Sequence, residues 1–327
     1  MSNVSKEPVK PMVARRGPWN DRSPYMILVC GLLSVFYLWL LTACGPVSSG
    51  KAGPARAKSS HPQRIISLSP NVTEILDGVG AFDRVIAVSD FCDYPPAVKR
   101  LPRVGGWQTT SLEQVNALQP DLVIMTRPQA PFVETHLKAL GFKTLVVDSR
   151  TLEDTVHSID QIGRATGNEA EGESLVRQVQ SALDAVRAKT RHLSRPNVLC
   201  VVDRVPGTLR DLYTATEGSF LAQLIEIAGG RSIAPPAAAG YAEISKEAVV
   251  TLNPEVIIDM VQAAKGRFAE NSTSLWQELS EVSAVHDGRI YPLRDTSVLH
   301  PSQFVAATAH RFGHIIHPEA FPDAANP

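Results

Sequence analysis

One segment of the sequence occurs twice in related form, and this limits the folds open to the chain. SLEQVNALQPDLVIM begins at Ser111 and SKEAVVTLNPEVIID begins at Ser245, an offset of 134 residues without a gap. Each copy predicts a short helix that begins after a serine, ends before a proline and leads into an apolar strand. The offset is too long for a solenoid repeat and suits one small domain. We therefore predict two related α/β lobes; two unrelated helix–proline–strand units are the alternative.

The first copy belongs to a longer stretch, residues 89–125, that reads as loop, helix and strand after an apolar run. Pro95 and Pro96 interrupt regular structure, because proline has no backbone N–H and restricts the residue before it. Tyr94 and Trp107 are therefore expected on loops that hang from a strand–helix–strand frame. Loops on a rigid scaffold commonly carry binding residues.

Strands and helices alternate through the rest of the chain, which predicts a mainly parallel sheet with helices on both faces in each lobe. Between the lobes, residues 151–192 contain no proline and place apolar residues at helical spacing. One long helix fits this pattern, and so do two helices joined near Gly167 and Asn168. The predicted divisions are a first lobe over residues 64–150, a linking helix over residues 151–193 and a second lobe over residues 194–327.

The N-terminal segment indicates export. Basic residues precede residue 25, residues 26–43 carry no charge, and LTAC ends at Cys44. A basic region, an apolar core and small residues before a cleavage point are typical of a secretion signal. The LTAC ending resembles a bacterial lipobox with Cys44 as the lipidated residue, although the apolar run approaches the roughly 20 residues of a transmembrane anchor. We expect a signal or anchor over residues 1–43 and a flexible tether over residues 44–63.

Composition and motifs argue against several function classes. The formal net charge is −1 and no long run of one sign occurs, so nothing indicates a nucleic-acid partner. No P-loop, glycine-rich dinucleotide turn or nucleophile elbow is present, so no catalytic residue is predicted. We expect a binding protein and not an enzyme; an anchored metal-binding or hydrolytic enzyme is the alternative.

The cysteines and histidines give weaker signals. Cys92 and Cys200 are the only cysteines of the predicted folded part. An extracytoplasmic location permits a disulfide, but the two lie in different predicted lobes, so we expect separate thiols. Four histidines near the C-terminus have spacings that zinc sites use, but no cysteine accompanies them locally, so we predict no metal site. They are His300, His310, His314 and His317.

Four segments together resemble the substrate-binding proteins of ABC importers, over about residues 64–318. They are RIISLSPNVTEIL, SDFCDYPP, GGWQTTSLEQVNALQPDLVIM and SKEAVVTLNPEVII. Within that class, the chain looks most like the vitamin B12 (cobalamin) binders of the iron-siderophore/cobalamin group. The resemblance implies a class III periplasmic-binding-protein fold, in which one long backbone helix joins the lobes and limits their relative motion.

The resemblance also implies a ligand site between the lobes. In the cobalamin binders, the tyrosine of the DYPP segment and the tryptophan of the WQ segment line the cleft, which carries this role onto Tyr94 and Trp107. Tyr241 stands at a tryptophan position of the family. Arg127 and His300 are expected on loops beyond strand ends, where open α/β folds bind ligands.

Two departures leave the ligand open. Thr126 stands where the cobalamin-like pattern has a further tryptophan, and DTSVLHPSQ replaces an acidic-aromatic loop of the second lobe. The expected ligand is cobalamin or a related corrinoid, bound without a cofactor. A ferric siderophore or haem is the alternative.

Glu113 and Glu247 occupy matched positions in the two copies, each two residues after the serine. The helix dipole stabilises a carboxylate in the first turn, which is a sufficient reason for both. The resemblance implies in addition that they pair with arginines of the importer's two membrane subunits. We therefore predict a monomeric, membrane-anchored lipoprotein, in the periplasm or on the cell surface, that delivers a small-molecule ligand to an ABC permease.

Overall fold

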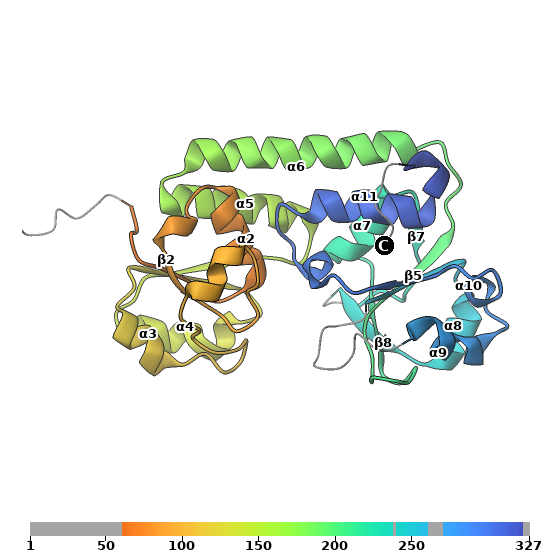
Figure 1. Cartoon of the computed structure of the whole chain (residues 1–327), viewed down its shortest axis with the longest axis horizontal. Coiled ribbons are helices and arrows are strands. Elements are labelled where there is room, and N and C mark those ends of the chain that lie inside the picture. Colours follow the sequence, from red (N-terminus) through yellow and green to blue (C-terminus); the bar gives the residue numbers. More distant parts are fainter. Residues whose placement is uncertain (1–60, 238–239, 261–270, 323–327) are drawn as a thin grey trace, which may run out of the picture. The chain divides into compact units, whose positions relative to one another are not determined.

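The computed structural model describes residues 61–237, 240–260 and 271–322. These residues form two α/β lobes joined by helices, and they belong to one compact unit that begins at Ser59 (Figure 1). Cys44, the predicted signal or anchor and nearly all of the predicted tether lie outside the described residues. In the described ranges, no helix combines the length and the apolar character needed to cross a membrane.

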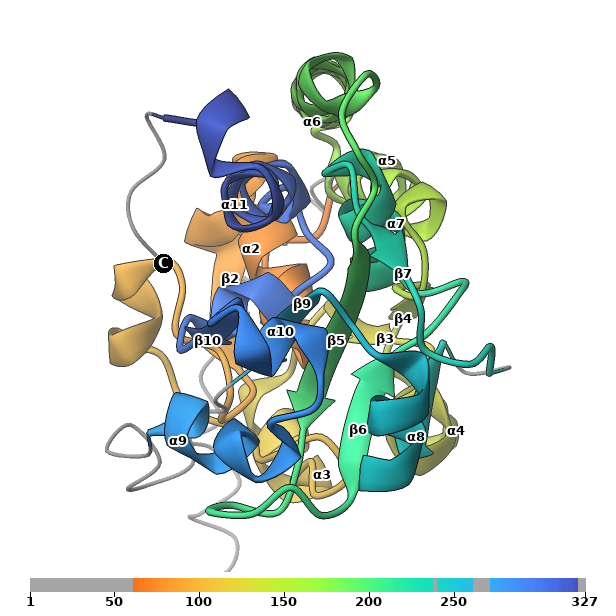
Figure 2. The same ribbon diagram turned by 90° about the vertical axis from the view of Figure 1, so that its right-hand side faces the viewer.

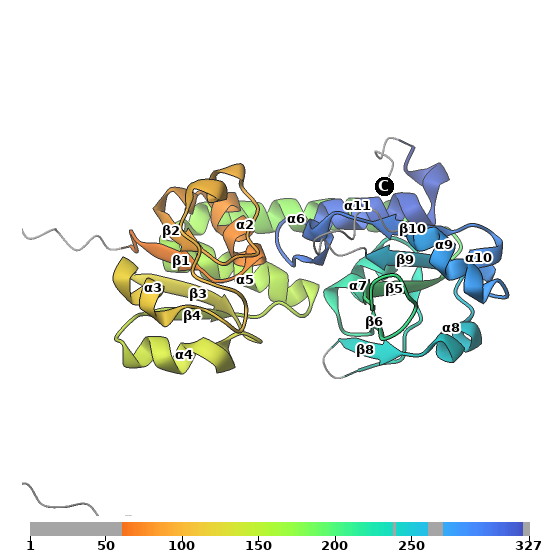
Figure 3. The same cartoon turned by 60° about the horizontal axis from the view of Figure 1, so that its bottom comes forward.

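The first lobe contains a four-stranded sheet in the order β2-β1-β3-β4, and every neighbouring pair is parallel. Helices α3 and α4 cover one face of this sheet, whereas α2 and α5 cover the other (Figure 3). The strands are β1 (Ile65–Ser67), β2 (Val85–Val88), β3 (Leu122–Thr126) and β4 (Thr144–Val147), and the helices of this lobe are α2 (Pro70–Gly78), η1 (Phe82–Arg84), η2 (Pro96–Arg100), α3 (Leu112–Leu118) and α4 (Ala130–Ala139).

Two helices, not one, link the lobes: α5 (Leu152–Thr166) and α6 (Glu169–Thr190). The prediction of a single helix over residues 151–193 is wrong, and the alternative of two helices is confirmed. Gly167 ends α5 because it takes the left-handed conformation, with φ 74°. Helix α6 is the long connecting helix, since it contacts α2 and α5 at one end and α7 and α11 at the other (Figure 1).

The second lobe contains a mixed sheet in the order β10-β9-β5-β6-β8, with β7 also paired to β5. Strands β5, β7, β9 and β10 run parallel, whereas β6 pairs antiparallel with β5 and with β8. The expectation of a mainly parallel sheet therefore holds fully only in the first lobe. The strands are β5 (Asn197–Asp203), β6 (Leu212–Ala215), β7 (Arg231–Ser232), β8 (Tyr241–Ile244), β9 (Val256–Met260) and β10 (Ile290–Leu293).

Helices cover both faces of the second sheet as well (Figure 2). Apolar residues of α7 and α11 pack with alternate residues of β5, and those of α8 and α9 pack with the residues between them. The helices are α7 (Phe220–Ile227), α8 (Lys246–Leu252), α9 (Ser272–Trp276), η4 (Gln277–Leu279), α10 (Ser283–His286), η5 (Thr296–Leu299), α11 (Val305–Ile316) and η6 (Pro318–Ala320).

The repeated segment forms the same unit in each lobe. Helices α3 and α8, and strands β3 and β9, begin and end at residues that differ by the 134-residue offset of the sequence. The side chains of Ser111 and Ser245 cap the two helices by accepting the backbone N–H groups of Gln114 and Ala248, each at 3.3 Å. The prediction of two related α/β lobes is therefore confirmed.

Candidate ligand-binding site

Three of the predicted ligand residues follow strands of the first lobe. Because all four strands are parallel, their carboxyl ends lie along one edge of the sheet. Tyr94 and Trp107 lie in the segment after β2, and Arg127 directly follows β3. The side chains of Tyr94 and Trp107 are 37% and 43% exposed, although aromatic side chains usually bury most of their surface. Two exposed aromatic rings at this edge are typical of a ligand site.

Three local features fix the loop that carries Trp107: a hydrogen bond, a glycine turn and a ring contact. Buried Gln129 donates a hydrogen bond from Nε2 to the backbone oxygen of Trp107, at 3.2 Å. Gly105, with φ 96°, allows the tight turn, because a Cβ there would lie 2.3 Å from the carbonyl oxygen of Thr109. The indole ring lies against Phe132, with the ring centroids 5.8 Å apart and the planes at 54°. Trp107 and Phe132 together form an exposed aromatic surface.

Arg127 pairs with Asp148, which follows the neighbouring strand β4. The guanidinium uses Nε and Nη2, and Nη2 lies 3.0 Å from Oδ2 of the carboxylate. This hydrogen-bonded cation holds the pKa of Asp148 below its usual value. Both side chains remain open to water, 64% and 40% exposed. The other N–H donors of the guanidinium can still bind an amide or an anionic group of a ligand.

Tyr94 contacts the second lobe. Its ring meets the ring of Phe304 edge to face, with centroids 5.0 Å apart and planes at 88°. Partial burial and, to a smaller extent, the nearby Asp77 raise the pKa of the Tyr94 phenol. The phenol therefore stays protonated at neutral pH, and its hydroxyl can donate or accept a hydrogen bond.

Tyr241 and His300, the predicted ligand residues of the second lobe, are more enclosed. Tyr241 lies in β8 and stacks on Tyr213, with the ring centroids 6.3 Å apart. It also packs against the main apolar core, and burial raises the pKa of its phenol. The side chain of His300 is 15% exposed, and its Nδ1 lies 2.6 Å from Oε1 of Glu74 in the first lobe. His300 is thus engaged across the lobes, and a ligand role for either residue remains a prediction.

The sequence interpretation missed four side chains at or beside these residues. Phe132 and Glu74 carried a usable signal. Phe132 lies in the first turn of a helix that follows a strand end, and Glu74 is a charged residue within the apolar run VTEIL. The sequence carried no such signal for Phe304 and Tyr213, because each contacts a ring that is distant in the sequence. The four are Glu74, Phe132, Tyr213 and Phe304.

The two acidic residues with a predicted docking role have equivalent positions. Glu113 and Glu247 are each the second residue of a short helix, α3 and α8, and both side chains are exposed. A hydrogen bond with Ser245 lowers the pKa of Glu247, which keeps this carboxylate charged at neutral pH. Both side chains are therefore accessible to a partner.

The remaining cysteines and histidines have other contacts. Cys92 and Cys200 are separate, buried thiols, as expected. Across the described part of the chain, no group of three or more His, Cys, Asp or Glu side chains is arranged to hold a metal ion. The C-terminal histidines contact a ring or a backbone oxygen: His310 the ring of Phe321, His314 the oxygen of Phe321, and His317 the oxygen of Gly229.

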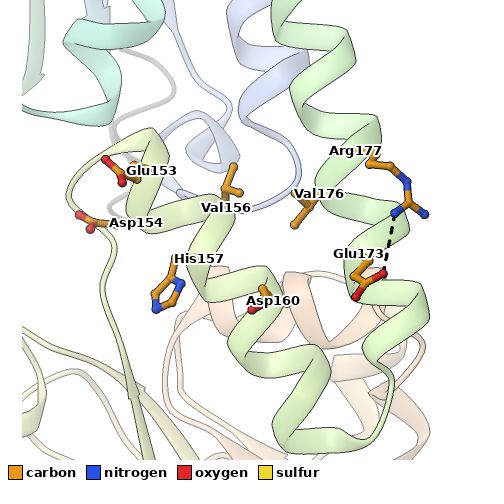
Figure 4. A pocket seen from close by; sticks show the side chains of 8 residues that line it. All are labelled: Glu153, Asp154, Val156, His157, Asp160, Glu173, Val176 and Arg177. Carbon is orange, nitrogen blue, oxygen red and sulfur yellow. Dashed lines mark ion pairs between the residues drawn. The ribbon is translucent and has the colours of Figure 1, made fainter.

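A hollow of about 640 Å³ lies between α5 and α6, and none of the predicted ligand residues lines it (Figure 4). Four of its eight lining side chains are acidic. Most of these carboxylates have partners, since Asp154 caps α5, Asp160 pairs with Arg164 and Glu173 lies 3.9 Å from Arg177. The strand-end aromatic residues therefore remain the better candidate site.

The two lobes, the helical link and the exposed aromatic loops define a two-lobed α/β binding protein. Residues 65–296 match the periplasmic binding protein family, and the chain belongs to this family. Membership implies a location outside the cytoplasm, and it is consistent with the expectation of a non-enzymatic protein, because the family consists of binding proteins.

Known proteins support this assignment. A vitamin B12-binding protein of Vibrio parahaemolyticus is 28% identical over 276 residues, which cover 84% of this chain and 91% of that protein. The crystal structure of the periplasmic vitamin B12 binding protein BtuF of Vibrio cholerae has a TM-score of 0.68 at 24% identity, covering 79% of this chain and 98% of that one. The apo periplasmic heme-binding protein RhuT of Roseiflexus sp. RS-1 has a TM-score of 0.69 at 24% identity, covering 79% and 99%.

The structural similarity confirms the predicted class III fold. The family match and the relatives also confirm the resemblance to ABC-importer substrate-binding proteins of the iron-siderophore/cobalamin class.

Proposed function

We propose that this protein captures cobalamin or a related corrinoid between its lobes and delivers it to the permease of an ABC importer. One observation carries the choice of site: Tyr94 and Trp107 are exposed at the carboxyl edge of the first lobe's sheet. The similarity to a vitamin B12-binding protein over 84% of this chain supports the choice of ligand.

The chemistry of this edge suits a large, mostly flat ligand with polar side groups. Aromatic faces provide a large apolar contact area at little cost in conformational entropy. Trp107 and Phe132 provide such a surface, and Tyr94 adds a hydroxyl group. Arg127 adds a donor for the amides at the rim of a corrinoid. No cofactor is needed, because capture involves no covalent step.

Haem or a ferric siderophore is the second candidate. Thr126, at the end of β3, is 6% exposed and stands where the cobalamin-like pattern has a tryptophan. The aromatic surface is therefore smaller than that pattern implies, which favours a smaller ligand.

The remaining features fit delivery. Cys44 would carry the lipid anchor, and residues 44–63 would let a monomer reach the permease from the membrane surface. Glu113 and Glu247 would contact the two membrane subunits, because each lobe presents one exposed acid at the same place.

Calorimetric titration of the detergent-solubilised full chain with cyanocobalamin tests this proposal, with hemin as the second probe. We expect one-to-one binding that weakens about 30-fold or more in Trp107→Ala, as for a central aromatic contact. Leu140→Ala is the matched control, because Leu140 is 48% exposed but follows the far end of α4. Binding of hemin alone would move the ligand class to haem. Equal affinity in Trp107→Ala would place the site elsewhere, and no binding of either probe would contradict the proposal.

A further inference from the structure

Glu74 is a buried carboxylate that joins the two lobes. It lies in α2 of the first lobe and is 1% exposed. Its Oε1 lies 2.6 Å from Nδ1 of His300, and its Oε2 accepts a hydrogen bond from the hydroxyl of Ser302. Nε2 of Gln303 donates a hydrogen bond to the backbone oxygen of Glu74, at 2.8 Å. One short segment of the second lobe is therefore bound at three points to one residue of the first.

Two of these contacts are expected to be strong, because they involve the buried carboxylate of Glu74. A buried carboxylate is costly unless it is fully hydrogen-bonded, and bonds to a charged acceptor are roughly twice as strong as neutral ones. Breaking them leaves the charge of Glu74 without partners inside the protein. The segment of residues 300–304 is therefore fixed to α2 independently of the link through α6.

The same segment reaches the candidate ligand site. Phe304, two residues after Ser302, presents its ring to Tyr94 at 5.0 Å. Asp77, less than one turn beyond Glu74 in α2, also acts on the Tyr94 phenol. Helix α2 and the segment of residues 300–304 thus both interact with this aromatic side chain.

We propose that Glu74 is a positioning residue of the ligand site, because it fixes the segment of residues 300–304 so that Phe304 holds the ring of Tyr94. This inference rests on the proposed function, since it assigns Tyr94 to the ligand. Glu74 itself is too buried to contact a ligand directly.

Hydrogen exchange of the full chain without ligand tests the connection first. Glu74→Gln removes the charge and leaves one acceptor oxygen where the carboxylate has two, so the contacts to His300 and Ser302 weaken and residues 298–305 should exchange about tenfold faster. The same increase is expected in residues 89–101, the loop that carries Tyr94. In this loop the backbone N–H groups of Cys92 and Val98 donate hydrogen bonds to the backbone oxygens of Ser89 and Pro95. Glu171→Gln makes the same chemical change at an exposed position of α6 and should alter neither segment.

Titration with cyanocobalamin, and with hemin, then tests the consequence for binding. Glu74→Gln and Phe304→Leu should both weaken the probe that binds by about tenfold, and Glu171→Gln should not. Ser302→Ala is the milder second variant, in case Glu74→Gln does not fold. It should shift exchange and affinity in the same direction, by less.

The outcomes separate the two ideas. Faster exchange in both segments with weaker binding supports the positioning role. Unchanged exchange in residues 89–101, or unchanged affinity despite faster exchange, overturns it. If the unmodified chain binds neither probe, the proposed function fails, while exchange in the loop of Tyr94 still decides whether Glu74 positions that residue.

Discussion

Gln119 and Asn253 end their helices in the same left-handed conformation, with φ 45° and 41°, and lie 134 residues apart. In each case the next residue is a proline, Pro120 or Pro254, which restricts the backbone before it. Among the described residues, only Asp211 is a third non-glycine residue with positive φ. The two lobes therefore share a backbone conformation at a position where their side chains differ.

Glycine at these two positions should have different effects on stability. A left-handed non-glycine residue costs about 1–2 kcal/mol, so Gln119→Gly should raise the free energy of unfolding by about 0.5–1 kcal/mol after the entropy cost of glycine. Asn253→Gly should not, because Oδ1 of Asn253 accepts the N–H of Ser283 at 2.8 Å. Urea unfolding measures the free energy of unfolding of both variants, and its slope against urea concentration should stay unchanged. An equal gain in the two variants would contradict this account.

Two arginine–aspartate pairs should differ strongly in their contribution to stability. Arg204 and Asp259 are 5% and 0% exposed, and Oδ2 of the carboxylate also accepts Nε1 of Trp276 at 3.0 Å. Asp259→Ala should therefore cost about 3–5 kcal/mol, because it leaves a buried cation without its main partner. Asp148→Ala removes the exposed partner of Arg127 and should cost less than about 1 kcal/mol. Denaturant unfolding of the two variants compares them directly, and similar losses would refute the prediction.

Reversal of either predicted docking charge should impair transport without affecting capture. We expect Glu113→Lys and Glu247→Lys each to reduce stimulation of the importer's ATPase about tenfold in proteoliposomes, because the proposed ion pair with the permease would become a repulsive contact. Cyanocobalamin affinity should stay the same. Glu153→Lys is the matched control, since Glu153 is also an exposed second residue of a helix, α5. Loss of ligand affinity in either docking variant would sink this role.

The repeated unit was predictable because its signals are local. A capping serine, a proline and an apolar run fix α3 and β3, and the same pattern fixes α8 and β9. The loops of Tyr94 and Trp107 were predictable for the same reason. The strand β8 was not, because its residues follow an Ala/Pro/Gly-rich stretch and pair with β6 only in the folded lobe.

Contacts between distant residues had no sequence signal. His300 was expected on a ligand loop, but its partner Glu74 lies 226 residues away, so no spacing pattern connects them. Gly167 left the linking segment open between one helix and two, because a glycine can end a helix or sit inside one. In the structure, Gly167 takes the left-handed conformation and ends the first helix, so the segment forms two helices.

Stability should fall as the pH rises above about 9, and Cys200 should account for part of the fall. Burial in β5, and then the charge of Asp259, raise the pKa of Cys200 to about 12. An unfolded thiol titrates near pH 8.5, so above that pH the unfolded chain releases a proton that the folded chain keeps. The stabilising contribution is complete below about pH 8.5 and is lost as the pH rises towards 12, at up to about 1.4 kcal/mol per pH unit.

Urea unfolding under reducing conditions, at pH 8 and pH 10, measures this dependence. Cys200→Ala should flatten it, whatever the variant's absolute stability. Cys92→Ala should flatten it less, because hydrogen bonds from Ser89 and Thr73 to the Cys92 thiol oppose the effect of its burial. The pH range stops at 10 because an unfolded tyrosine titrates near that value, and the raised pKa of Tyr241 then adds a loss of its own. An equal pH dependence in Cys200→Ala and the unmodified chain would show that this thiol ionises freely in the folded protein.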